Sequence, residues 1–334
     1  MLKQIHKNIQ KEYKRFIKRE FRKLFGKFDF EIGYNVWADV WKNYYIENHL
    51  IIQEKINLLK NSLDKDSKKT VDQITERYFF MLPWQKHKNI YLYDENEFFS
   101  HEGKLSLNQE LIIDRQKYKL PDGIYYEDSI FNYGHGIKLL SGTILSNIKE
   151  KDFIDGGAFA GDSAIVLNDY TSAKIYSFEP DAHNFNLLNK TIELNKLENK
   201  IIPVQLGISE DEKEITVYPT DFCNSVIALD EKTKQTPIII NTTSIDKFAD
   251  KNNLNIGLIK LDIEGNELEA IWGAKETIIK NKPILLISIY HHPKDFFEIK
   301  PLIESWNLNY KFIIKKLSEA SPTYETMLIG WAEN

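Results

Sequence analysis

The chain has 334 residues, of which 42% are hydrophobic and 28% are charged, so it suits one large or two moderate soluble domains. The net charge of −5 argues against nucleic acid as the main partner. The single cysteine, Cys223, excludes an internal disulfide and a cysteine-based zinc cluster, and it favours a reducing compartment. No apolar run reaches the length of a bilayer span and no signal peptide is evident, so we expect a cytoplasmic protein without a transmembrane segment.

Residues 1–27 form a basic arm. They carry ten Lys or Arg and two Glu, a local charge of +8 that leaves −13 for the rest of the chain. Apolar residues recur within the arm at helical spacing. The pattern fits a helix in peripheral contact with a membrane surface, or a docking arm. Such charge runs more often belong to a terminal helix that packs on its own acidic body or on a second subunit, and we expect a homodimer.

The helical pattern continues to about residue 82. The polar stretch 64–69 reads as a connection between helices, and the aromatic cluster from Val36 to Tyr45 is typical of a core. We interpret residues 1–130 as a mainly helical N-terminal extension that serves dimerisation and substrate selection. Residues 131–334 would then form the catalytic domain.

From residue 153 apolar runs alternate with helical patterns, which predicts a parallel sheet covered on both faces. No helix separates the last two apolar runs, so they should pair antiparallel at the sheet edge. An extra strand at 213–218 should lie at an edge. The predicted strands are 153–157, 174–178, 201–206, 257–262, 284–290, 310–315 and 326–332, and the predicted helices are 162–170, 182–196, 244–252, 266–280 and 295–305.

A glycine turn follows the first of these strands. The strand delivers Asp155 to the carboxyl edge of the sheet, and the glycines let a ligand lie against the backbone and the next helix N-terminus. Glu179 ends the second strand about 20 residues later, where it can bind ribose hydroxyls. This pair fits a dinucleotide or S-adenosylmethionine. The glycine spacing and the antiparallel closing pair favour S-adenosylmethionine.

The segment Phe131–Gly136 precedes the turn and is rich in aromatic residues and glycine. Tyr133 and His135 either lie over the cofactor or belong to a plain loop in which His135 is hydrogen-bonded.

Two further groups of polar residues follow predicted strands. Asp262 and Glu264 come at the end of one strand and would share a face if the strand runs that far, whereas Glu267 suits the first turn of the next helix. His291 and His292 follow the next strand. The carboxylates or a histidine could orient a substrate hydroxyl and take its proton. Alternatively, Asp262, Glu264, His291 and His292 could bind a divalent metal.

The ordered set Phe153–Ala158, Gly161-Asp162, Phe178–Asp181, Ile259–Gly265 and Tyr290-His291 resembles the FkbM-type methyltransferases. The resemblance runs from about residue 150 to the end. It implies a class I, Rossmann-like fold: a mostly parallel sheet with an antiparallel last strand, here preceded by the helical region. Many members have a histidine near the end of the penultimate strand, where this chain has Ile314–Ser318, so no role is assigned there.

The resemblance also implies an activity and a site. The family consists of S-adenosylmethionine-dependent O-methyltransferases that modify hydroxyls of sugars and polyketides, which suggests a sugar or nucleotide-linked sugar acceptor in bacterial capsule or lipopolysaccharide synthesis. The catalytic residues would be Asp262, Glu264 and His291. Two alternatives are a dinucleotide-dependent oxidoreductase and a non-catalytic cofactor-binding partner protein. The cofactor would be bound by Tyr133, His135, Asp155, Gly156, Gly157, Ala158, Gly161, Asp162, Ser163, Glu179, Pro180 and Gly207.

Overall fold

The fold is described from a computed structural model. It describes residues 31–33, 38–81, 91–93, 116–219, 224–225, 237–318 and 323–333. The basic arm 1–27, the first residues of the aromatic cluster and Cys223 lie outside these ranges.

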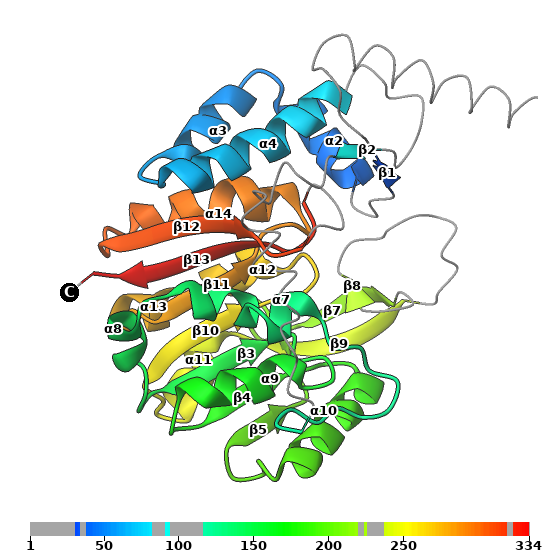
Figure 1. Ribbon diagram of the computed structural model, residues 1–334, viewed down its shortest axis with the longest axis vertical. Helices are drawn as coiled ribbons and strands as arrows, with labels where there is room; N and C mark the ends of the chain where they lie inside the picture. The colour runs from blue at the N-terminus through cyan, green and yellow to red at the C-terminus, as the bar shows by residue number, and fades with distance from the viewer. Residues whose placement is uncertain are drawn as a thin grey trace, which may run out of the picture.

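A seven-stranded sheet forms the centre of the molecule, in the order β12-β13-β11-β10-β3-β4-β5. Neighbouring strands from β11 to β5 are parallel, and β13 is antiparallel to both β11 and β12 (Figure 1). The predicted fold class is therefore confirmed, including the antiparallel pair. The strands are β3 (Asp152–Gly156), β4 (Ile175–Phe178), β5 (Ile201–Val204), β10 (Ile256–Leu261), β11 (Ile284–Ser288), β12 (Tyr310–Lys316) and β13 (Thr326–Ala332).

The central strands are apolar because both faces of the sheet are covered. Every residue of β10 and of β11 is buried. The predicted helix over 266–280 is instead two helices, broken at Gly273, where an added Cβ would lie 2.3 Å from the Ser209 carbonyl oxygen. The covering helices are α9 (Asp162–Leu167), α10 (Ala182–Asn195), α11 (Ile245–Lys251), α12 (Glu267–Trp272), α13 (Lys275–Asn281) and α14 (Pro293–Ser305).

A second sheet has the order β6-β9-β7-β8. Its strand β7 is the predicted extra strand, whereas β9 was not predicted although its run of isoleucine and threonine is typical of a strand. The strands are β6 (Gly207–Ile208), β7 (Glu214–Pro219), β8 (Asn224–Ser225) and β9 (Ile238–Thr243). The other short elements described are β1 (Glu31–Gly33), paired with β2 (Tyr91–Tyr93), then α7 (Asp128–Phe131), η2 (Gly134–Leu139), α8 (Gly142–Ser146) and η3 (Asn168–Tyr170).

Three N-terminal helices, α2 (Ala38–Asn48), α3 (Ile52–Lys60) and α4 (Lys65–Met81), pack beside α14 and β12 (Figure 1). The prediction of a connection at 64–69 is wrong. The Asp64 carboxylate accepts a hydrogen bond from the Ser67 backbone at 2.6 Å, so it caps a helix that begins at Lys65.

The aromatic cluster is a core, as predicted, for the members that the structure describes. Trp41, Tyr44 and Tyr45 are buried and contact Phe297 of α14. Trp41 also donates its indole hydrogen to the carbonyl of Tyr290 at 3.1 Å. The helical region thus holds the turn after β11 in place. Its boundary with the catalytic domain stays a prediction.

No helix among the described residues is long and apolar enough to cross a membrane.

Candidate active site

The glycine turn after β3 lies against the end of β10. Gly157 and Gly161 have positive φ angles of 74° and 86°, and Phe159 between them adopts 44°. A Cβ on Gly157 would lie 1.8 Å from the Asp262 carbonyl oxygen, so only glycine allows this contact. The turn and Asp262 therefore meet at one point of the sheet edge.

Asp155 faces into the protein. Its carboxylate has no exposed surface, and it accepts hydrogen bonds from the Ser163 hydroxyl at 3.0 and 3.1 Å and from the Ser177 hydroxyl at 3.1 Å. The Lys260 ammonium lies 3.2 Å from the same carboxylate. Asp155 and Ser163 are thus bound to each other beside the glycine turn, and their direct contact with a cofactor stays a prediction.

Lys260, which was not among the predicted site residues, ties β10 to the turn. Its ammonium donates to the carbonyl oxygens of Gly156 and Gly157 at 3.1 and 2.7 Å. Burial opposes its charge, but Asp155 and Asp262 hold the pKa of Lys260 above its usual value. The side chain is therefore a buried cation that fixes the backbone of the turn.

Glu179 borders the turn on the β4 side. Its two carboxylate oxygens accept from the backbone of Phe159 at 3.0 Å and of Asp181 at 2.9 Å. Burial raises the pKa of Glu179 to about 7. A carboxylate has about four acceptor positions, so two remain for a ligand. Asp181 caps α10 as predicted, Pro180 lies between the two acids, and Gly207 is buried at the start of β6.

The acids after β10 are placed by a strained loop and not by the strand. The strand ends at Leu261, so the predicted sharing of a strand face by Asp262 and Glu264 does not apply. Glu264 instead has a φ of 59° and Gly265 has one of 100°. Glu267 accepts hydrogen bonds from the backbone of Ile263 at 2.8 Å and of Gly265 at 2.9 Å, which fixes this loop.

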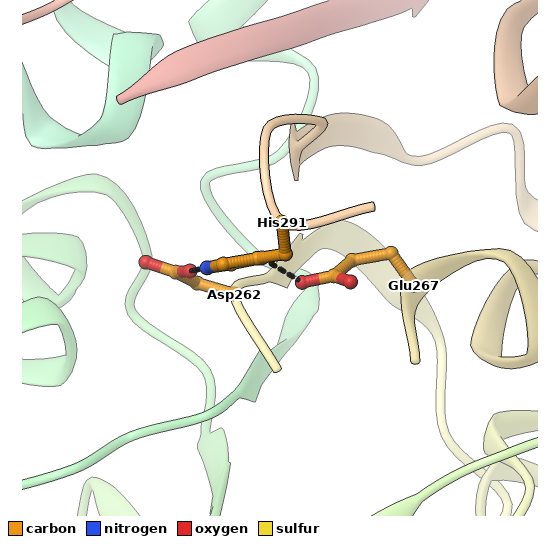
Figure 2. A group of neighbouring side chains, drawn as sticks. All are labelled: Asp262, Glu267 and His291. Carbon is orange, nitrogen blue, oxygen red and sulfur yellow. Dashed lines mark hydrogen bonds and ion pairs between the residues drawn. The ribbon is translucent and has the colours of Figure 1, made fainter. Parts of the chain in front are cut away.

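His291 lies between two carboxylates (Figure 2). Its Nδ1 is 2.8 Å from Glu267 Oε1, and its Nε2 is 3.4 Å from Asp262 Oδ1 and 3.6 Å from Glu264 Oε2. The ring is buried, whereas the Asp262 and Glu264 side chains are 19% and 21% exposed. Burial opposes a charge on His291, but the three carboxylates hold its pKa well above the usual value. The result is a chain of proton-binding groups that reaches the surface at Asp262 and Glu264.

Asp262, Glu267 and His291 each offer a ligand atom, and these atoms lie within 4.8 Å of one another. The imidazole separates the two carboxylates, however, with Nδ1 facing Glu267 and Nε2 facing Asp262 (Figure 2). This arrangement suits a proton relay, and the binding of a divalent metal by these side chains stays a prediction. His292 directs its Nδ1 at the Lys294 backbone at 3.0 Å and caps α14.

Tyr133 and His135 lie at the start of η2, which contacts α9 and β13. His135 is buried, and the charges of Lys260, Asp262 and Asp155 act on it. Burial and Lys260 lower its pKa to about 4, so its imidazole is neutral. Tyr133 is half-buried. The structure thus packs this segment against α9 and β13, and a contact of Tyr133 or His135 with the cofactor stays a prediction.

Glu127 and Glu325 add two carboxyl groups near the relay that were not predicted. Burial and neighbouring acids raise the pKa of Glu127 to about 7 and that of Glu325 to about 8. Burial is also the main cause that raises the pKa of Asp162 to about 6. Glu325 accepts the Tyr290 hydroxyl at 3.1 Å. Glu127 precedes α7 and Glu325 precedes β13, and no local motif marks either residue, because only the tertiary fold brings them to the site.

The sheet order, the single inserted antiparallel strand and the glycine turn at the carboxyl edge define a class I methyltransferase fold. Residues 155–319 match the model of the Methyltransferase FkbM domain. These residues therefore form a domain of the FkbM methyltransferase type.

One of the solved structures that match the chain supports this fold. The methyltransferase FkbM from Methylobacillus flagellatus KT aligns with a TM-score of 0.56 and 20% identity over 87% of this chain. The chain spans 61% of that protein. A putative O-methyltransferase from Klebsiella pneumoniae aligns with a TM-score of 0.41 and 10% identity, covering 72% of this chain and 99% of the other. No curated protein matches the sequence.

Proposed function

We propose that this protein is an S-adenosylmethionine-dependent O-methyltransferase that acts on a hydroxyl of a sugar or nucleotide-linked sugar in bacterial capsule or lipopolysaccharide synthesis. The observation that carries the proposal is the contact between the glycine turn and Asp262, which belongs to a buried proton relay with His291 and Glu267. Methyl transfer to oxygen requires that the methyl donor and the acceptor hydroxyl be aligned, with a base beside them for the hydroxyl proton. A cofactor turn next to a carboxylate meets this requirement.

The residues around the turn suit an adenosyl cofactor. Gly157 and Gly161 provide the left-handed residues of the turn and its close contacts with Asp262 and Leu188, and Glu179 retains acceptor positions for two ribose hydroxyls. Gly207 lies beyond Glu179, on the side where the adenine would bind. When bound, the cofactor supplies an electrophilic methyl group. Asp155, Asp162 and Ser163 support the turn on which it would lie.

The relay handles the acceptor proton. Asp262 is the partly exposed member and accepts the hydrogen bond of the acceptor hydroxyl, with Glu264 beside it. The Asp262–His291 pair then takes the proton, while Glu267 holds the ring and stabilises its charged form. Since this pair must first lose its own proton and the pKa of His291 is raised, we expect methyl transfer to accelerate as pH rises above neutrality.

The activity test is methyl transfer to a panel of nucleotide sugars by the wild type and by His291→Asn. We expect turnover in the variant to fall by about 10²- to 10⁴-fold, the range of general acid–base effects, with S-adenosylhomocysteine affinity unchanged. The variant His49→Asn, on the exposed end of α2, is the control. Full turnover in His291→Asn would remove His291 from the mechanism.

Two alternative functions would give different results. A dinucleotide-dependent oxidoreductase would bind NAD(H) in preference to S-adenosylhomocysteine. A non-catalytic partner protein would transfer no methyl group to any acceptor, yet bind its target tightly through the basic arm. We also infer a cytoplasmic location from the composition and a homodimer formed through the N-terminal extension. Sedimentation of the full chain tests the dimer, and binding to anionic vesicles tests a membrane contact of the arm.

A further inference from the structure

His135 is a buried polar side chain that the fold itself does not satisfy. Its side chain is 2% exposed, and neither ring nitrogen has a hydrogen-bond partner among the described residues. A buried polar group left without a partner costs about 1–3 kcal/mol. The interpretation of His135 as a hydrogen-bonded loop residue is therefore wrong, and another reason must place an imidazole here.

The backbone at this position is also strained. Gly134, His135 and Gly136 have positive φ angles of 55°, 52° and 102°. The left-handed conformation is unfavourable for a residue with a Cβ, by about 1–2 kcal/mol. A Cβ on Gly136 would lie 2.3 Å from Ile329 of β13, so the segment is packed closely against the sheet. Strain of this kind is concentrated at ligand sites.

The sheet order shows which part of a cofactor would reach His135. Strands β4 and β10 flank β3 on opposite sides, so Glu179 and Asp262 lie on opposite sides of the glycine turn. A cofactor whose ribose is at Glu179 must extend across the turn towards β10. Its amino-acid end therefore lies towards β10, on the side of Asp262 and Lys260. The charges of these two residues influence the pKa of His135.

The neutral imidazole has the chemistry for this end of the cofactor. It offers one N–H donor, which suits a carboxylate, and one lone pair, which suits an ammonium group. Lys260 cannot take this role, because its ammonium is bound to Asp155 and to the carbonyls of Gly156 and Gly157.

We propose that His135 is a positioning residue that hydrogen-bonds the amino-acid end of the adenosyl cofactor and holds the reactive sulfur beside Asp262. The inference rests on the proposed S-adenosylmethionine dependence and adds a specific contact to it.

The test compares two ligands on three proteins by calorimetry. S-Adenosylhomocysteine has the amino-acid end, whereas 5′-methylthioadenosine lacks it. For His135→Leu we expect S-adenosylhomocysteine affinity to fall about tenfold or more, which corresponds to about 1.4 kcal/mol. Affinity for 5′-methylthioadenosine should not change. His135→Asn should lose less, because asparagine tolerates a left-handed backbone and still hydrogen-bonds. His49→Leu is the matched control on an exposed histidine.

The thermal midpoint separates this role from a structural one. Removing an unpartnered polar group should leave the midpoint of His135→Leu equal to or above that of the wild type. Unchanged S-adenosylhomocysteine affinity in His135→Leu would overturn the proposal, as would equal losses for both ligands or a midpoint lowered in both variants. If the wild type itself does not bind S-adenosylhomocysteine, the proposed function fails and not only the role of His135.

Discussion

The two sides of the glycine turn differ in how the fold satisfies their polar groups. On the β4 side, Asp155 and Glu179 accept hydrogen bonds from their own surroundings. On the β10 side, Glu264 and His135 adopt left-handed backbone conformations, and His135 lacks hydrogen-bond partners among the described residues. The fold itself provides hydrogen-bond partners for the polar groups of the β4 side. The β10 side has backbone strain and charged groups that a bound ligand would stabilise.

Replacing Lys260, the buried cation paired with Asp155, should have the largest effect on the free energy of unfolding. Lys260→Met leaves Asp155 buried beside two serine hydroxyls without its ion pair. Breaking a buried pair in this way costs about 3–5 kcal/mol, which urea unfolding would measure. Lys280→Met, on the exposed face of α13, is the control. A loss below about 1 kcal/mol in Lys260→Met would mean that the turn does not depend on this pair.

The carboxyl-rich side should make stability depend on pH with a defined sign. The pKa values of Glu127 and Glu325 are raised to about 7 and 8, so the folded state keeps protons that the unfolded state releases near its ordinary value of 4.5. Stability should therefore fall as pH rises from about 5 to 8, by up to about 1.4 kcal/mol per pH unit for each group. His291, whose pKa is also raised, acts in the same direction.

Urea unfolding at pH 5, 6.5 and 8 measures this slope. Glu325→Gln should flatten it, because the amide cannot release a proton. Glu276→Gln, which changes an exposed carboxylate in the first turn of α13, is the comparison variant. A wild-type slope of the opposite sign would show that the carboxyl groups of this side are not stabilised in their protonated form.

The contrast between the two sides also explains what could be predicted. The strand positions in the main sheet, the antiparallel closing pair and the glycine turn follow from local patterns, the alternation of apolar runs and the spacing of Gly157 and Gly161, so they were predicted. The roles of Lys260 and Glu267 were missed because their partners are remote in sequence. Lys260 binds Gly156 at a separation of 104 residues, and Glu267 binds His291 at 24.

Backbone strain also limited how well the sequence could predict the positions of the acids after β10. Asp262 and Glu264 were predicted to share a face if the strand ran that far, but the strand ends at Leu261 and Glu264 approaches His291 with a left-handed backbone. The position of β9 was missed although its β-branched run is a local signal. Sequence patterns predict the common backbone conformations. They do not predict a conformation such as that of Glu264, which tertiary contacts impose.

The central claim is that an adenosyl cofactor binds across the glycine turn, with its ribose at Glu179. The most direct measurement is a calorimetric titration of S-adenosylhomocysteine into the wild type and Glu179→Ala. We expect the wild type to bind and the variant to lose binding, because its alanine cannot accept the ribose hydroxyls. Equal affinity in the two proteins, or a wild type that binds NAD(H) and not S-adenosylhomocysteine, would contradict the account.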